Sequence, residues 1–109
     1  MFKPNHELGE QNQEKKQRAL AEIKKFAADW EMAHIICLGS GQFLVERLDE
    51  QGEQLGLYDF NDRGDLISFN IKEGPSELNN IINDFEQSGI GAQVIDLKRQ
   101  KPKSAEAVK

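Results

Sequence analysis

The first pattern along the chain is that of an amphipathic helix. From about Gln13 onward, apolar side chains recur every three or four residues, and charged side chains occupy most positions between them. The apolar positions are Leu20, Ile23, Ala27, Trp30 and His34. This spacing places them on one face of a helix, and several alanines in the segment favour helix formation. The pattern predicts an amphipathic helix that lies on a sheet.

Strand patterns follow the helix. The expected strands cover residues 35–38, 43–48, 55–60 and 65–71, with glycine-containing turns between them. In the fourth strand Ile67, Phe69 and Ile71 alternate with polar residues, which is typical of a strand with one buried face. Glycine supplies the positive φ that tight hairpin turns need. We therefore expect a four-stranded antiparallel meander, with these three residues in the core.

A second helix and a final strand complete the pattern. The sequence Gly74-Pro75-Ser76-Glu77 is typical of a helix start, and Gly89 is a natural stop. Between them lies an apolar stripe at helical spacing, Leu78, Ile81, Ile82 and Phe85. Residues 92–97 form the final strand. The expected fold class is α+β, with both helices packed on one face of the sheet.

Length and composition indicate one domain. We expect a flexible lead-in over 1–12, a single α+β domain over 13–97 and a basic, disordered tail over 98–109. Cys37 is the only cysteine, which excludes the disulfide-stapled secreted class. With no signal peptide and no membrane-spanning stretch in the pattern, we expect a cytoplasmic protein without membrane contact. A domain this small could be a monomer, or a homodimer through a leftover apolar face.

Charge is distributed unevenly. Between Ile35 and Leu97 there are twelve acidic and three basic side chains, a net charge of −9, whereas residues 98–109 carry a net charge of +4. The acids concentrate in two hairpin turns, expected at one end of the meander, and these turns are the candidate partner-binding residues. They are Asp49, Glu50, Glu53, Asp59, Asp62 and Asp65. The negative electrostatic field of such a cluster indicates a basic partner.

No metal or cofactor motif is complete. Asp59 to Gly64 resembles a calcium loop, but Arg63 stands where an oxygen ligand belongs, and Asn70 replaces the bidentate glutamate. The glycines of Gly39-Ser40-Gly41 could approach a phosphate, yet a strand follows them where a nucleotide loop requires a helix. We therefore expect neither a metal nor a cofactor.

No catalytic residue stands out either. His6, His34 and Cys37 are too few and too scattered for a zinc site. A Cys37–His34 nucleophile pair is conceivable, but the apolar run around Cys37 raises a thiol pKa and favours a buried core cysteine. Carboxylates are so abundant that no acid–base pair can be singled out. We expect a protein that is not an enzyme.

Three functions remain open. The first is a small acidic interaction module, such as an inhibitor, immunity or chaperone-like accessory protein, that docks on a basic partner protein. The second is a nucleic-acid-associated accessory protein that uses the basic tail, a weaker possibility because the acidic domain would repel phosphates. Its residues would be Lys98, Arg99, Lys101 and Lys103. The third is a small ligand-binding domain between meander and helices.

Overall fold

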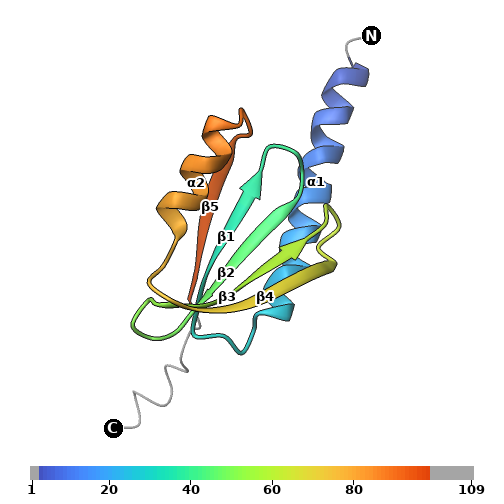
Figure 1. Cartoon of the computed structure of the whole chain (residues 1–109). Coiled ribbons are helices and arrows are strands. Elements are labelled where there is room, and N and C mark those ends of the chain that lie inside the picture. The colour runs from blue at the N-terminus through green and yellow to red at the C-terminus, as the bar shows by residue number, and fades with distance from the viewer. Residues whose placement is uncertain (1–2, 99–109) are drawn as a thin grey trace, which may run out of the picture.

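The computed structural model describes residues 3–98, with backbone only for residues 3–12. The expected α+β class is confirmed, with the elements in the expected order (Figure 1). They are α1 (Lys3–Phe26), β1 (Met32–Leu38), β2 (Phe43–Leu48), β3 (Gln54–Phe60), β4 (Leu66–Gly74), α2 (Leu78–Gln87) and β5 (Ala92–Lys98). Helix α1 begins ten residues earlier than expected, at Lys3, and so includes most of the expected lead-in.

The five strands form one antiparallel sheet in the order β4-β3-β2-β1-β5. The meander of β1 to β4 is as expected, and β5 joins it beside β1, so that β4 and β5 are the two edges. Gly52 and Gly64 supply positive φ, of 85° and 87°, in the turns on either side of β3. After α2, Gly89 also has a positive φ, and the Ile90 N–H donates to the Phe85 carbonyl, which ends the helix as expected.

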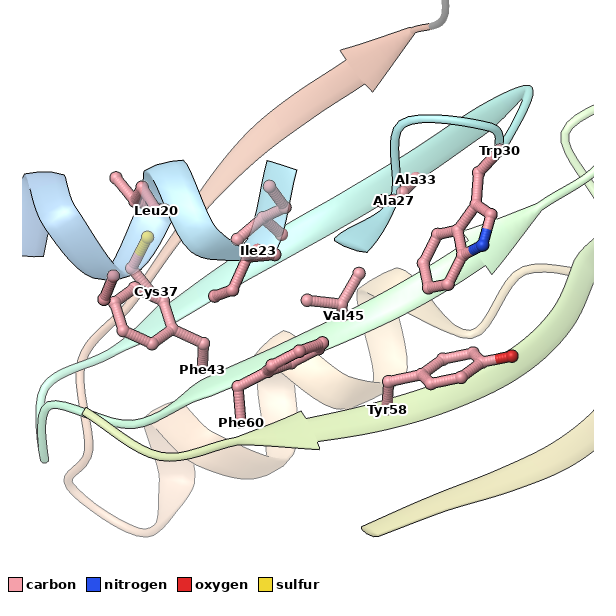
Figure 2. Close-up of a cluster of buried hydrophobic side chains, with 12 residues drawn as sticks. Leu20, Ile23, Ala27, Trp30, Ala33, Cys37, Phe43, Val45, Tyr58 and Phe60 are labelled. Carbon is pink, nitrogen blue, oxygen red and sulfur yellow. The ribbon is translucent and has the colours of Figure 1, made fainter. Parts of the chain in front are cut away.

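The main core lies between α1 and one face of the sheet (Figure 2). Side chains alternate along a strand, so Ile35 of β1, Val45 of β2 and Phe60 of β3 all face α1, where they are fully or almost fully buried. The helix contributes the apolar stripe predicted from its spacing, and Trp30 packs at its C-terminal end. No residue of β4 belongs to this core cluster.

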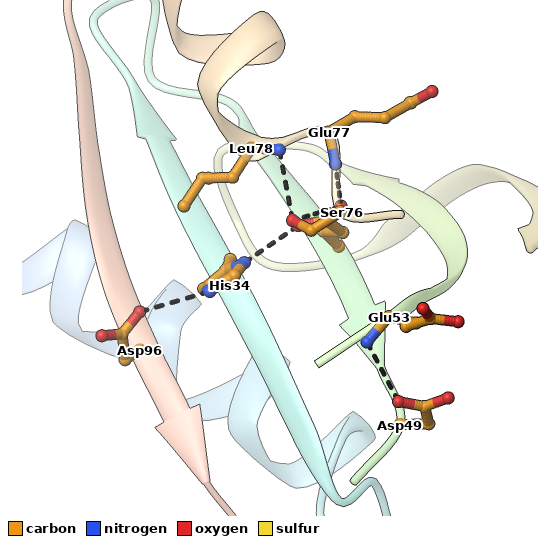
Figure 3. A network of polar contacts seen from close by, with 8 residues as sticks. His34, Asp49, Glu53, Ser76, Glu77, Leu78 and Asp96 are labelled. Carbon is orange, nitrogen blue, oxygen red and sulfur yellow. Dashed lines mark hydrogen bonds and ion pairs between the residues drawn. The ribbon is translucent and has the colours of Figure 1, made fainter. Parts of the chain in front are cut away.

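The two helices cover opposite faces of the sheet, and the expectation of a shared face is wrong. Ile36 and Glu46 are buried on the face away from α1, and Glu46 is hydrogen-bonded to the start of α2. All three views place α1 and α2 on opposite sides (Figures 1 to 3). The physical reason is the continuous apolar run of β1, because neighbouring residues point to opposite faces and both sets must be covered.

The fourth strand does not enter the core, contrary to expectation. Ile67, Phe69 and Ile71 are 57%, 57% and 60% exposed. They do share one face, as their alternation predicts, but α1 packs over β1, β2 and β3 and leaves that face of β4 uncovered. Within residues 3–98, no helix is long and apolar enough to cross a membrane.

Candidate functional site

One end of the sheet brings together seven acidic residues from three segments of the chain. A single row of paired residues crosses the sheet near this end, namely Lys98, Met32, Leu48, Gln54 and Gly74. Three segments adjoin this row: the connections 27–31 and 49–53, and residues 73–77, which begin at the end of β4. Together they hold seven acidic residues and no basic one. We call this the acidic end: Asp29, Glu31, Asp49, Glu50, Glu53, Glu73 and Glu77.

The carboxylates of the acidic end differ in what they contact. Asp49 Oδ1 accepts the backbone N–H groups of Gln51 at 2.9 Å and Glu53 at 3.0 Å, which fixes the β2–β3 turn. Glu77 is paired with Lys72 at 2.8 Å. The side chains of Glu50, Glu53 and Glu73 are exposed to solvent. Asp49 and Glu77 therefore shape the loops, and the exposed glutamates are available to a partner.

The other three predicted carboxylates lie at the opposite end of the sheet, so the expected grouping at one end is wrong. Asp59, Asp62 and Asp65 surround the β3–β4 turn, and successive turns of a meander fall at alternate ends of the strands. The seven residues of β3 separate the two turns by roughly 20 Å. The two groups therefore cannot form one compact binding surface.

Local contacts also occupy this second group. Asp62 Oδ2 accepts a hydrogen bond from Lys15 Nζ at 2.8 Å, and this bond holds the pKa of Asp62 below its usual value of 3.8. Asp65 lies 3.5 Å from Arg63 Nε, and Asp59 accepts the Ser68 hydroxyl at 3.0 Å. Their charges are thus partly balanced, unlike those of the exposed glutamates at the acidic end.

The β3–β4 turn also shows how the calcium-like pattern is used. Asn61 Oδ1 accepts the backbone N–H groups of Arg63 and Asp65, each at 2.9 Å. An asparagine that bonds to the backbone two residues on is a standard turn former. In the described part of the chain, no three His, Cys, Asp or Glu residues are grouped as metal ligands would be.

A buried polar network on the α2 face was not foreseen from sequence (Figure 3). Glu46 is fully buried on the face of the sheet away from α1. Its carboxylate accepts hydrogen bonds from the Ser76 hydroxyl at 2.9 Å and from the Glu77 backbone N–H at 2.8 Å. His34 Nδ1 lies 2.9 Å from the same carboxylate. The one sequence signal was a glutamate inside the apolar strand Phe43–Leu48. Since buried polar groups must be paired, the network holds α2 on the sheet.

Cys37 is buried as expected and is not placed to act as a nucleophile. It is 6% exposed, and burial raises the pKa of its thiol above the usual value of 9.0 despite the nearby Lys16. It faces α1, whereas His34 faces α2 and contacts Glu46. The strand therefore separates the two members of the conceivable catalytic pair.

A pocket of about 540 Å³ lies at the end of the sheet opposite the acidic end. Its lining includes Lys16, Cys37, Gly39, Ser40 and Gln93, from α1, β1, the β1–β2 turn and β5. The volume is within the range of small-molecule sites. This is where a ligand would bind if the third function held.

The predicted nucleic-acid-binding residues fall mostly beyond the described part. Lys98 is the exposed last residue of β5, in the row next to the acidic end. Arg99, Lys101 and Lys103 lie outside the described residues, as does the side chain of His6.

Comparison with known proteins gives no relative. No protein-family model, no curated protein and no solved structure matches this chain. The function has to be inferred from the arrangement of the residues.

Proposed function

We propose that this protein is a small, acidic, non-enzymatic interaction module that docks on a basic partner protein through its acidic end. It would act as an inhibitor, immunity or chaperone-like accessory protein, and we place it in the cytoplasm. The observation that carries the proposal is the convergence of seven carboxylates from three segments at one end of the sheet, where Lys72, paired with Glu77, and Lys98 offset only part of the negative charge.

The physical basis is electrostatic. Like charges gathered from separate loops raise the local negative potential above that of any one loop, and such a field steers a cationic surface toward it. Glu50 and Glu53 extend from one turn, and Glu73 lies beside that turn because Gln54 is paired with Gly74. A partner with several Lys or Arg side chains could therefore contact both segments at once. Attraction of this kind weakens as salt is added.

The two alternatives have less support. The first basic residue of the tail, Lys98, lies beside the acidic end, where a phosphate backbone would be repelled. A ligand in the pocket would find a thiol whose pKa is raised and lysines that already bond to Asp62 and Gln93. A basic protein is the partner that the exposed charge favours.

Two matched triple variants test the proposal. Glu50→Gln/Glu53→Gln/Glu73→Gln and Asp59→Asn/Asp62→Asn/Asp65→Asn each remove three negative charges, the first at the acidic end and the second at the far end of the sheet. Binding of a fluorescent oligolysine peptide and capture of proteins from a lysate should both be lost in the first variant and retained in the second. The wild-type affinity should fall steeply with salt.

Two results would overturn the proposal. Equal loss of binding in both variants would show that only net charge matters. Unchanged capture in the first variant would show that the acidic end is not the docking site.

A further inference from the structure

An exposed apolar strip runs along the free edge of the sheet. We define the β4 strip as Phe26, Leu66, Ile67, Phe69 and Ile71, whose exposed fractions are 46%, 37%, 57%, 57% and 60%. Phe69 stacks on Tyr58 with ring centroids 5.5 Å apart, and Phe26 packs edge-on against Tyr58 at 6.0 Å. The strip therefore lies on the α1 side of the sheet, continuous with the core but open to solvent.

The middle of this edge carries little of the usual protection. Edge strands normally carry charges, proline or bulges that prevent pairing with another chain. Residues 66–71 of β4 contain no charge and no proline, and the charged Lys72 and Glu73 lie near the end of the strand. The pairing of β4 with β3 is regular over Ser68–Ile71, and the register shifts on either side of this stretch. At the opposite edge, β5 carries Asp96, 73% exposed, and Lys98. The exposed apolar strip beside the uncharged, regularly paired stretch Ser68–Ile71 singles out β4 as the edge that can accept another strand.

We propose that a second copy of this chain covers the β4 strip, by antiparallel pairing of the two β4 strands around a two-fold axis at Phe69. The axis is perpendicular to the sheet, so the two sheets become one and both strips lie on the same face. The proposal rests on the β4 edge and is independent of the acidic end. The two acidic ends would point in opposite directions and stay accessible in the dimer.

The sequence of β4 selects this register. Paired residues of antiparallel strands point to the same face. The axis must therefore lie between the two copies of one residue, which is then paired with itself. With the axis at Phe69, Ile67 faces Ile71 of the second copy and Phe69 faces itself. With the axis at Asn70, Ile67 would face Glu73, and with the axis at Ser68, Ile71 would face Asp65. Only the register at Phe69 pairs every strongly exposed apolar side chain of β4 with another apolar one.

The area is consistent with a weak dimer. At roughly 200 Å² for a large side chain, the exposed part of the β4 strip amounts to about 500 Å². Edge-to-edge pairing covers only the flanks of these side chains that face the second copy, together with the backbone edge, so the interface is smaller than the standard of about 800 Å² per partner. Each copy has a net charge of −5, so long-range repulsion opposes association, and added salt should strengthen the dimer.

The first test measures the mass of the full chain by size-exclusion chromatography with light scattering. We expect a dimer that Phe69→Asp converts to a folded monomer, with circular dichroism as the check on folding. Asn70→Asp is the matched control, since it adds the same charge to the same strand on the opposite face, and it should remain dimeric. The dimer fraction should rise with salt, whereas binding of oligolysine should fall, so failure of one proposal is distinguishable from failure of the other.

The second test measures the register. In a Cys37→Ala background, Phe69→Cys should form an intermolecular disulfide under mild oxidation, because directly opposed Cα atoms lie about 4.5–5.5 Å apart, within the range that a disulfide spans. Asn70→Cys should react more slowly. A wild-type monomer at about 100 µM, where interfaces of even micromolar affinity form, would overturn the proposal. So would a dimer unaffected by Phe69→Asp, or equal cross-linking at both positions.

Discussion

The carboxylate of Glu46 accepts the backbone N–H of Glu77 at 2.8 Å. A fully buried side chain of β2 thereby binds the residue that precedes α2, and the same carboxylate receives the hydroxyl of Ser76. His34 Nδ1 lies 2.9 Å from the same carboxylate. These bonds hold α2 on the sheet, since the helix has no fully buried residue of its own.

Removing this carboxylate should loosen α2. Glu46→Ala removes the acceptor that the Ser76 hydroxyl and the Glu77 N–H share and the carboxylate that His34 contacts, and each buried polar group left unsatisfied costs about 1–3 kcal/mol. We expect the free energy of unfolding to fall by about 3 kcal/mol in urea titrations, and the amide protons of α2 to exchange faster. Ser76→Ala, which removes one hydroxyl, should cost about 1 kcal/mol. Equal costs for the two variants would contradict a central role for Glu46.

The β3–β4 turn should be less tolerant of substitution than the β2–β3 turn. Gly64 and Gly52 have nearly the same positive φ, but a Cβ on Gly64 would lie 2.6 Å from the Ala19 carbonyl oxygen of α1, whereas a Cβ on Gly52 meets nothing within 4 Å. Gly52→Ala should cost about 1–2 kcal/mol from backbone strain alone. Gly64→Ala should cost clearly more, and the difference measures the contact with α1. Thermal unfolding of the two variants provides the comparison.

Two phenylalanines of the sheet should respond differently to truncation. Phe60 is 1% exposed in the core, so Phe60→Ala should lower the free energy of unfolding by about 3–5 kcal/mol. Phe69 is 57% exposed, so Phe69→Ala should cost no more than about 1.5 kcal/mol, the contribution of its stacking on Tyr58. Denaturation at low protein concentration, where association is weakest, makes the comparison. Similar losses would show that Phe69 is buried in the folded monomer.

The buried thiol should make stability sensitive to alkaline pH. The pKa of Cys37 is raised by burial above 9.0, so the folded chain holds the thiol proton more tightly than the unfolded chain. Its contribution to stability is complete below the unfolded pKa and is lost as the pH rises through the folded value. We expect Cys37→Ala to show a shallower loss of stability above pH 9.0 than the wild type. The native thiol should also react slowly with a thiol reagent at neutral pH and rapidly in denaturant.

The exposed pair of Lys15 and Asp62 should show the opposite dependence. The Lys15 hydrogen bond lowers the pKa of Asp62 below 3.8, so the benefit of the pair is present above 3.8 and lost as the pH falls through the folded value. Lys15→Met should raise the pKa of Asp62 in an NMR titration of the carboxylates and leave stability nearly unchanged, because the pair is exposed. Lys25→Met, which removes a lysine paired with Glu22, should not move the Asp62 titration.

The sequence by itself determined the local structure of this protein. Spacing of three and four residues places Leu20 and Ile23 on one helix face, and glycine in the turns allows the hairpins that give the meander. The apolar run around Cys37 requires burial on both faces of β1, and the thiol is buried accordingly. These features depend on neighbours close in the chain, and their physical causes are visible in the residues themselves.

The tertiary structure decided which faces are covered and which loops meet. Periodicity shows that Ile67, Phe69 and Ile71 share a face, but only the path of α1 leaves that face exposed. Burial of Glu46 depends on α2 crossing the opposite side of the sheet. The acidic end exists because strand pairing joins segments more than forty residues apart, such as 27–31 and 73–77, a relationship that no local pattern encodes.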